Sequence, residues 1–272
     1  MELFNKTVLL TGASGGIGSA IATMLAKQGA RLLLVGRDLE KLQRLQEQLN
    51  EFNKEAGEKN HQIVNADITT GGGRNKITQI AEAESIDLVI NNAGTNALAL
   101  LESMTDDSVE KLLLTNLYSP MMLCKALIPI LMRKSESAIV NVGSILGSIG
   151  YAGSSVYCAS KFGLRGFTEA LRRELADTQI NVFYLAPRAT NTGLNTDEMR
   201  AMNRVLGNAT DSPEQVANAL LAQLQSKRNW NRYIGWPEKL FVRINSVLPQ
   251  WVDKAVFGQL PVIRRYAGHQ DK

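Results

Sequence analysis

Eight residues, Thr11-Gly12-Ala13-Ser14-Gly15-Gly16-Ile17-Gly18, join an apolar run at 7–10 to a helical pattern over 17–28. Gly12 permits a tight turn, Gly16 lets the backbone approach a pyrophosphate, and Gly18 allows a helix to pack closely on a strand. The start of the helix adds unpaired N–H groups and a positive dipole end. We predict a turn that binds a dinucleotide through Gly12, Ser14, Gly15, Gly16, Ile17 and Gly18; the alternative is a glycine-rich loop without a ligand.

Short apolar runs alternate with helical patterns on both sides of this junction. Strands are predicted at 7–10, 31–35, 61–65, 87–91, 138–142, 180–185 and 233–236, and helices at 17–28, 39–50 and 157–176. The first six runs lack polar alternation, as strands do when both faces of a parallel sheet are covered. We therefore predict an α/β protein with a doubly wound parallel sheet, the Rossmann fold. Residues 1–236 form this single domain, and 237–272 form an amphipathic C-terminal helical extension of it.

The composition fits one globular domain. Hydrophobic residues make up 44% of the 272 residues, and 30 Lys and Arg are interleaved with 26 Asp and Glu, so no basic block marks a nucleic-acid site. Cys124 and Cys158 are too few for a disulfide framework, which indicates free thiols in a reducing compartment. No charged and apolar leader is visible, and prolines interrupt the apolar stretch at 117–132, which is too short to span a bilayer. These features predict a soluble cytoplasmic protein.

The end of the second predicted strand, Val35-Gly36-Arg37-Asp38, bears on the choice of cofactor. NAD enzymes usually have a carboxylate here for the adenosine ribose, and NADP enzymes a cation for the 2′-phosphate. Arg37 offers a planar fork suited to phosphate, whereas Gly36 offers no side chain. Asp38 leaves NAD(H) open, and both charged residues also suit the start of a helix that Asp38 caps. We predict NADP(H), with NAD(H) as the lesser alternative.

Tyr157 and Lys161 lie four residues apart in a helical pattern, so their side chains face the same side one turn apart. An ammonium group favours phenolate and is expected to lower the pKa of the tyrosine toward neutral pH. A tyrosine tuned in this way exchanges protons with a carbonyl or alcohol oxygen. A buried aromatic residue beside an exposed lysine is the alternative for this pair in isolation.

Further polar positions are expected at the same edge of the sheet. Ser144 follows the strand at 138–142, where it donates a hydrogen bond to a substrate oxygen or serves only as a turn residue. Asn92-Ala93-Gly94 follows the strand at 87–91, and Gly94 lets the backbone approach a cofactor. Asn116 stands inside a helical pattern, where asparagine is unfavourable, and so indicates a bent helix, a bound water or a surface position.

Together these motifs resemble those of the short-chain dehydrogenase/reductase family over roughly residues 5–235. The matching positions are Thr11-Gly12-x-x-x-Gly16-x-Gly18, Asp67, Asn91-Asn92-Ala93-Gly94, Asn116, Ser144 and Tyr157-x-x-x-Lys161. The resemblance implies that Tyr157 is the acid/base, that Lys161 lowers its pKa and holds the nicotinamide ribose, and that Ser144 polarises the substrate oxygen. It also implies that Asn116 anchors a water, that Asp67 and Ile68 border the adenine, and that the protein is a homodimer or homotetramer.

One departure from the family pattern follows the sixth predicted strand. The family usually has Pro-Gly there, whereas this chain has Pro187-Arg188. Thr192 keeps the spacing at which family members contact the nicotinamide carboxamide or phosphates, so Pro187 and Thr192 are predicted cofactor residues. Arg188 contacts an acidic or phosphate-bearing substrate or the cofactor, or forms a surface salt bridge. The long polar segment at 188–211 is expected to be a mobile loop with a role of its own.

A helical apolar stripe continues beyond the last predicted strand. Its residues are Leu240, Phe241, Ile244, Val247, Leu248, Trp251, Val252, Ala255 and Val256, flanked by Lys239, Arg243, Lys254, Arg264 and Arg265. Pro249 is expected to kink or break the helix. We expect, in descending order, that the stripe packs on its own domain or a subunit, covers the substrate cleft, or makes a peripheral contact with a membrane.

The predicted activity is NADP(H)-dependent interconversion of a carbonyl and a secondary alcohol on a small, lipid-like or acyl substrate. A catalytically idle NADP(H)-binding sensor or scaffold on the same fold is the alternative. Substrate contacts are expected within 95–101, 145–155 and 188–208. His61 and His269 belong to no ligand-like cluster, so no metal is predicted and both histidines are expected to be exposed polar residues.

Overall fold

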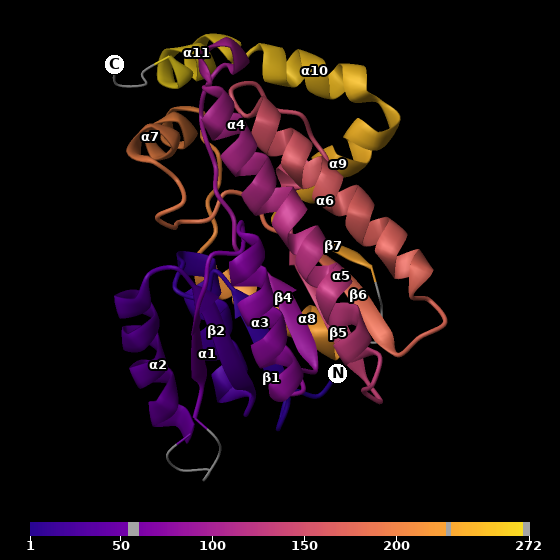
Figure 1. Cartoon of the computed structure of the whole chain (residues 1–272). Coiled ribbons are helices and arrows are strands. Elements are labelled where there is room, and N and C mark those ends of the chain that lie inside the picture. Colours follow the sequence, from indigo (N-terminus) through magenta and orange to yellow (C-terminus); the bar gives the residue numbers. More distant parts are fainter. Residues whose placement is uncertain (54–59, 227–229, 269–272) are drawn as a thin grey trace.

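A parallel sheet forms the centre of the molecule (Figure 1). The computed structural model describes residues 1–53, 60–226 and 230–268, and within these ranges seven strands follow the order β3-β2-β1-β4-β5-β6-β7. The strands are β1 (Thr7–Thr11), β2 (Arg31–Gly36), β3 (Gln62–Asn65), β4 (Leu88–Asn91), β5 (Ser137–Val142), β6 (Ile180–Ala186) and β7 (Asn231–Tyr233). The order reverses between β1 and β4, so a crevice forms there outside the carboxyl ends of the strands. The predicted doubly wound sheet is confirmed.

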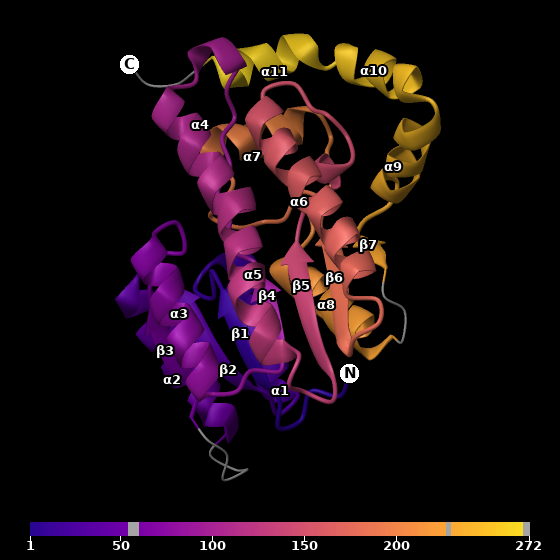
Figure 2. The same cartoon turned by 45° about the vertical axis from the view of Figure 1, so that its right-hand side comes forward.

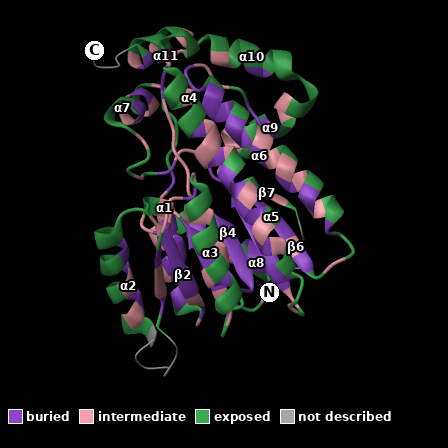
Figure 3. Ribbon diagram, viewed as in Figure 1, coloured by how far each residue is buried: buried purple, intermediate pink, exposed green. Residues whose placement is uncertain are grey.

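Helices cover both faces of the sheet, as the turned view in Figure 2 shows. One face carries α1 (Gly16–Lys27), α2 (Leu39–Asn53) and α8 (Pro213–Gln225), and the other carries α3 (Gly71–Ala83), α5 (Ser119–Leu131) and α6 (Ser155–Glu174). Successive strand residues point to opposite faces, so Leu10 packs with the first set of helices and Leu9 with the second. Both faces of the sheet are therefore buried (Figure 3), which explains the unbroken apolar runs.

The predicted bounds of the elements hold to within a few residues, and β7 differs most. The sequence predicts this strand at 233–236, but it ends at Tyr233. Ile234 N–H still donates to Ala186 O at 2.9 Å, and Gly235 then adopts φ +96°, which turns the chain away from the sheet. Residues 54–59, in the polar segment before β3, lie outside the described residues.

One helical run is longer than the sequence predicts. α4 (Asp106–Leu113), the π turn η2 (Leu114–Tyr118) and α5 continue into one another over Asp106–Leu131, which is 26 residues. By length and composition this run is long and apolar enough to cross a membrane, so the prediction that the apolar stretch is too short and too interrupted is wrong. Pro120 and Pro129 both lie inside continuous helix. A core helix meets the same test, and Leu123 and Leu127 here are fully buried against the sheet.

The C-terminal segment lies over the carboxyl edge of the sheet. It contains α9 (Glu238–Val247), α10 (Pro249–Phe257) and α11 (Leu260–Ala267), drawn in yellow in Figure 1, and α10 starts at Pro249, where a break is predicted. Val252 packs with Ile149, and Ile263 packs with Met199 of α7 (Asp197–Val205). We call α7 and α9–α11 the roof. The segment 188–211 is thus no structureless loop, because it contains a helix of the roof.

His61 is buried rather than exposed, so that prediction is wrong. Only 2% of its surface is accessible, and its Nδ1 accepts a hydrogen bond from Leu32 N–H at 3.1 Å. Burial lowers the pKa of His61 to about 4, so the ring is neutral at pH 7 and suited to this acceptor role. His269 lies outside the described residues. Cys124 and Cys158 are buried free thiols, as predicted.

Candidate active site

The glycine-rich turn joins β1 to α1 through close backbone contacts. Gly12 adopts φ +63°, and a Cβ added there would lie 2.8 Å from Ala93 Cα. A Cβ at Gly18 would collide with Gly12 O. Both positions therefore require glycine, for the reasons that the sequence pattern indicates. At Gly16 a Cβ would lie 2.6 Å from Thr192 Cγ2, so the Thr192 side chain lies directly over the turn.

The end of β4 holds this turn in place. Asn92 Nδ2 donates to Thr11 O at 3.0 Å and to Gly12 O at 3.2 Å. In return, Thr11 Oγ1 accepts hydrogen bonds from Asn92 N–H at 3.0 Å and from Ala93 N–H at 3.1 Å. Asn92 and Ala93, which the sequence places among the cofactor residues, therefore brace the turn from within the protein.

The start of α1 is suited to an anion. Gly15 caps the helix without a side-chain hydrogen bond, and the first turn contains no acidic residue. Gly15 and Gly16 are exposed, and Ser14 and Ile17 are partly exposed beside them. Unpaired N–H groups at a helix start attract phosphate, and the helix dipole adds to the attraction. The residues of this turn thus fit the pyrophosphate of a dinucleotide.

Arg37 lies at the β2 end of the same edge. Its side chain is 69% exposed, and its Nη1 is 3.7 Å from Asp67 Oδ2, with the buried Ile68 next in the chain. Asp38 instead faces its own helix, because its Oδ1 accepts from Lys41 N–H at 3.1 Å, and this bond lowers the pKa of Asp38. Of the two charged residues that follow Gly36, Asp38 is thus a helix cap, and the guanidinium of Arg37 extends toward solvent.

Ser144 lies at the carboxyl end of β5 and caps the short 3-10 helix η3 (Ile145–Gly147). Its Oγ accepts a hydrogen bond from Leu146 N–H at 3.1 Å. A hydroxyl that accepts one bond keeps its own proton for another partner. The hydroxyl of Tyr157 is this second partner. Burial raises the pKa of Tyr157, and the hydrogen bond between the two hydroxyls opposes that rise.

Burial sets the protonation of Tyr157 and Lys161. Both lie on one side of α6, with Lys161 Nζ 5.8 Å from the centroid of the Tyr157 ring. Burial raises the pKa of Tyr157 to about 12 and lowers the pKa of Lys161 to about 8, while Nζ donates to Val142 O at 3.0 Å. The predicted lowering of the tyrosine pKa is therefore not found, because burial raises the pKa more than the hydrogen bond with Ser144 lowers it. The phenol is protonated at neutral pH and is a proton donor.

Asn116 lies in the π turn η2 and is buried, so the surface position among the predicted alternatives is wrong and the helix is irregular at this residue. Its Oδ1 accepts from Thr95 N–H at 2.8 Å, and its Nδ2 donates to Thr95 O at 2.8 Å and to Ser160 Oγ at 3.2 Å. A Cβ at Gly94 would lie 3.3 Å from Asn116 Oδ1 and 3.8 Å from Lys161 Nζ. The segment after β4 is thereby fixed beside α6.

A cavity of about 420 Å³ lies between the sheet edge and the roof. Predicted site residues line it, namely Ile17, Asn92, Gly94, Ser144, Tyr157, Lys161, Pro187 and Thr192. The roof supplies Met199, Met202, Asn203, Phe241, Val252, Ala255, Val256 and Gln259. Each of the predicted substrate segments also contributes residues. The C-terminal stripe was expected to pack on its own domain, to cover the cleft or to contact a membrane. Its inner face covers the cleft, and the stripe also packs on its own domain.

The comparisons with known proteins agree with this geometry. The family model described as short chain dehydrogenase matches residues 6–203. The chain belongs to the short-chain dehydrogenase/reductase family. A ketoacyl reductase, HetN, from Nostoc sp. strain PCC 7120 is 33% identical over 260 residues, which cover 93% of this chain and 88% of the relative. A 3-oxoacyl-(acyl-carrier-protein) reductase, FabG, from Rickettsia bellii is 32% identical over 84% of this chain and 92% of the relative.

A solved short-chain dehydrogenase from Sphingobium yanoikuyae, in complex with NADPH, superimposes with a TM-score of 0.76. It is 27% identical and covers 98% of both chains. As a member of this family, the protein is an oxidoreductase that acts on CH–OH or C=O groups of a small-molecule substrate with a nicotinamide cofactor.

Arg188, where this short-chain dehydrogenase departs from the family pattern, is held by two carboxylates. Its Nη2 is 2.7 Å from Asp211 Oδ1, its Nη1 is 3.0 Å from Glu238 Oε2, and its side chain is 14% exposed. These partners raise the pKa of Arg188, and a Cβ at Gly235 would lie 2.6 Å from its Cδ. The contacts favour the salt-bridge hypothesis for Arg188, which ties the segment after β6 to the start of α9.

Tyr184 of β6, which no sequence motif indicates, lies beneath Ser144. The nearest signal is the pair Gly143 and Gly147, where a Cβ would collide with the Tyr184 side chain.

Within the described ranges, no group of three or more His, Cys, Asp and Glu residues is arranged to hold a metal ion.

Proposed function

We propose that the protein is an NADPH-dependent reductase that converts a ketone in a lipid-like or acyl substrate into a secondary alcohol. The observation that carries this proposal is the position of the buried Tyr157 hydroxyl, which lies beside Ser144 in a cavity with an apolar roof. A phenol in this position is suited to protonate a developing alkoxide, which is the proton transfer that ketone reduction requires.

Ser144, Tyr157 and Lys161 line the cavity on the side of the sheet edge, which we call the floor, and each has a distinct task in this reaction. Ser144 donates a hydrogen bond to the carbonyl oxygen, and Tyr157 transfers its phenolic proton to the same oxygen as negative charge develops there. The Lys161 ammonium, fixed by Val142 O, lies beside the phenol and compensates the charge that remains on it after transfer. The nicotinamide cofactor supplies the hydride when bound, and the glycine turn, Pro187 and Thr192 would hold it.

The preference for NADP(H) over NAD(H) is supported by the β2 end of the sheet. Arg37 is exposed and carries the planar fork that pairs well with a phosphate, whereas Asp38 is engaged as a helix cap. Asp67 and Ile68 lie next to this position and suit the border of the adenine. The relative from Sphingobium yanoikuyae was solved with NADPH, which supports the same choice.

A substrate panel with both cofactors tests the proposal. It contains short ketones, medium-chain and long-chain ketones, 3-oxoacyl thioesters and long-chain alcohols, each with NADPH and with NADH. We expect turnover of ketones with an apolar chain, faster with NADPH. Tight NADPH binding without turnover of any member would contradict the proposal and favour the idle binding protein.

We also propose that the protein is a cytoplasmic homo-oligomer whose roof contacts anionic membranes peripherally. Trp251, Val247 and Phe257 are 68%, 75% and 74% exposed on the roof, with Lys239, Arg243 and Lys254 among them. Indole rings and basic residues together favour a lipid interface. Sedimentation velocity should give a dimer or tetramer, and vesicles with 30% phosphatidylglycerol, unlike pure phosphatidylcholine, should pellet the protein. A monomer, or equal pelleting with both vesicles, would contradict the respective part.

A further inference from the structure

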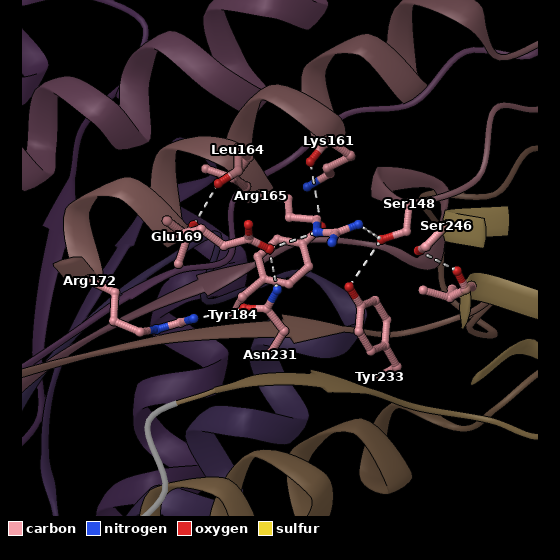
Figure 4. A network of polar contacts seen from close by, with 12 residues as sticks. Ser148, Lys161, Leu164, Arg165, Glu169, Arg172, Tyr184, Asn231, Tyr233 and Ser246 are labelled. Carbon is pink, nitrogen blue, oxygen red and sulfur yellow. Dashed lines mark hydrogen bonds and ion pairs between the residues drawn. The ribbon is translucent and has the colours of Figure 1, made fainter. Parts of the chain in front are cut away.

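Tyr184 is a completely buried tyrosine of β6, drawn beside Arg165 in Figure 4. Its Oη accepts a hydrogen bond from Ser144 N–H at 3.3 Å and lies 3.2 Å from Ser144 O and 3.5 Å from Lys161 O. A neutral phenol both accepts and donates, and burial raises the pKa of Tyr184, so it stays neutral. One hydroxyl therefore connects the peptide groups on both sides of Ser144 with the helical turn that carries Lys161.

The chain makes room for this ring at two glycines. A Cβ at Gly143 would collide with Tyr184 Cζ and Oη, and its three nearest atoms all belong to that side chain. A Cβ at Gly147 would collide with Tyr184 Oη and would also lie 2.7 Å from Lys161 O. Pairing of β5 with β6 sets Tyr184 opposite Asn141, just before this turn. Gly143, Gly147 and Tyr184 thus form one interlocking unit under Ser144.

A polar cluster holds the same unit from the side of α6. Arg165 Nη1 donates to Ser148 Oγ at 2.7 Å and Nε to Glu169 Oε1 at 2.9 Å, and Ser148 Oγ donates to Tyr233 Oη at 3.2 Å. Asn245 Nδ2 of α9 donates to Ser148 O at 2.8 Å. Figure 4 shows that this cluster lies beside Tyr184, so η3 cannot shift away from the ring without breaking several hydrogen bonds.

We propose that Tyr184 is a positioning residue for ketone reduction. Its hydroxyl fixes the Ser144 peptide and the α6 turn of Lys161 relative to each other, so that Ser144 and Tyr157 address one substrate oxygen. The residue does not touch substrate or cofactor and acts through Ser144. This inference rests on the proposed function, because it assigns a role within that reaction.

Replacing Tyr184 by Phe removes the hydroxyl and keeps the ring. We expect Tyr184→Phe to lower kcat on the order of tenfold, since small displacements of reacting groups cost that much, while KM for NADPH changes less than about twofold. In a Ser144→Ala background, the same change should lower kcat by less than about twofold, because the group through which Tyr184 acts is gone. Tyr266→Phe is the control, since this tyrosine of α11 packs with Ile263 and lies outside the cavity lining, and it should leave kcat within about twofold.

A compensating pair tests the interlocking unit. Gly143→Ala should reduce kcat strongly, and Tyr184→Val should restore part of the loss in the double variant, because the ring that meets the new Cβ is removed. Gly147→Ala should not be rescued by Tyr184→Val, because Lys161 O still lies 2.7 Å from its Cβ. Thermal unfolding of each variant separates loss of fold from loss of rate.

The outcomes separate this inference from the proposed function. Wild-type protein that reduces no ketone refutes the proposed function and the role of Tyr184 with it. Active wild-type protein with an unchanged kcat in Tyr184→Phe refutes only the positioning role. The full loss persisting in the Ser144→Ala background also refutes it, because Tyr184 would then act independently of Ser144.

Discussion

The glycine turn and the roof border one cavity but depend on contacts of very different range. In the turn, Gly18 approaches Gly12, which is six positions away, and the close contact leaves a pattern that can be read along the chain. In the roof, Ile263 packs with Met199 and Leu98, which come from distant parts of the sequence. Binding of the cofactor is thus encoded by local backbone geometry, whereas the shape of the substrate side is encoded by tertiary packing.

The two regions also differ in polarity. The start of α1 offers backbone N–H groups and contains no acidic residue in its first turn. The roof side offers Met199, Phe241, Val252 and Val256 to the cavity. A charged dinucleotide and an apolar substrate are therefore expected to meet at Tyr157, where the two regions join. Variants in the two regions should accordingly affect different kinetic constants.

The largest effect is expected at this junction. Tyr157→Phe removes the proton donor and should lower kcat for ketone reduction about 10³-fold, with the Kd of NADPH unchanged by fluorescence titration. Tyr151→Phe is the matched control, because its hydroxyl donates to Gln259 Oε1 of the roof at 2.8 Å, and its kcat should stay within about threefold. A kcat within tenfold of wild type in Tyr157→Phe would rule out the assigned proton donor.

The next largest effect is expected in the glycine turn. Gly18→Ala forces a Cβ against Gly12 O and should lower the free energy of unfolding by about 2–3 kcal/mol, with a loss of NADPH affinity above about tenfold. In Gly15→Ala the new Cβ lies 3.4 Å from Gly12 O, an ordinary contact, so stability should change by less than about 1 kcal/mol. Urea unfolding and cofactor titration measure both. A Gly18→Ala variant that is as stable as Gly15→Ala and binds NADPH as tightly as wild type would show that the turn tolerates a side chain at Gly18.

A smaller effect is expected at the adenosine end of the cofactor half. Arg37→Ala should weaken NADPH binding about tenfold, equivalent to about 1.4 kcal/mol, and leave NADH binding unchanged. Arg44→Ala provides a control of equal charge and equal 69% exposure, located in α2, seven residues further along the chain. If Arg37→Ala weakens both cofactors alike, the guanidinium does not read the 2′-phosphate.

The smallest effect is expected in the roof. Phe241→Ala shortens the apolar wall and should raise KM for a long-chain ketone about fivefold, or about 1 kcal/mol, without changing KM for a short ketone. Val247→Ala on the same helix is the control, because Val247 is 75% exposed and lies outside the cavity lining. A Phe241→Ala variant that keeps the wild-type chain-length profile would separate the roof from substrate selection.

Most of the sheet was predictable from the sequence, because strands covered on both faces form unbroken apolar runs. The placement of Tyr157 and Lys161 on one side of α6 was also predictable, because a spacing of four residues corresponds to about one helical turn. The pKa of Tyr157 was not predictable, because it depends on burial against residues of α4 and η3. His61 appeared exposed in the sequence for a similar reason, since its burial against β2 comes from packing.

Tyr184 and the roof mark the limit of inference from the sequence alone. A tyrosine in an apolar strand is ordinary, and its contact with Ser144 depends on the pairing of β5 with β6. The inner face of α10 was predictable as apolar, but its orientation toward the cavity depends on Val252 packing with Ile149. Local motifs therefore predicted the floor of the site, and tertiary contacts determine what lies above and below it.

The account depends on the glycine turn and Tyr157 holding the cofactor and the ketone in one fixed arrangement, in which only one face of the nicotinamide would meet the carbonyl carbon. Reduction of a ketone with NADPH deuterated at either C4 position, followed by mass spectrometry of the alcohol, tests it directly. We predict that only one of the two labelled cofactors transfers deuterium to the carbinol carbon. Transfer from both labels alike, or deuterium lost to water, would contradict the account.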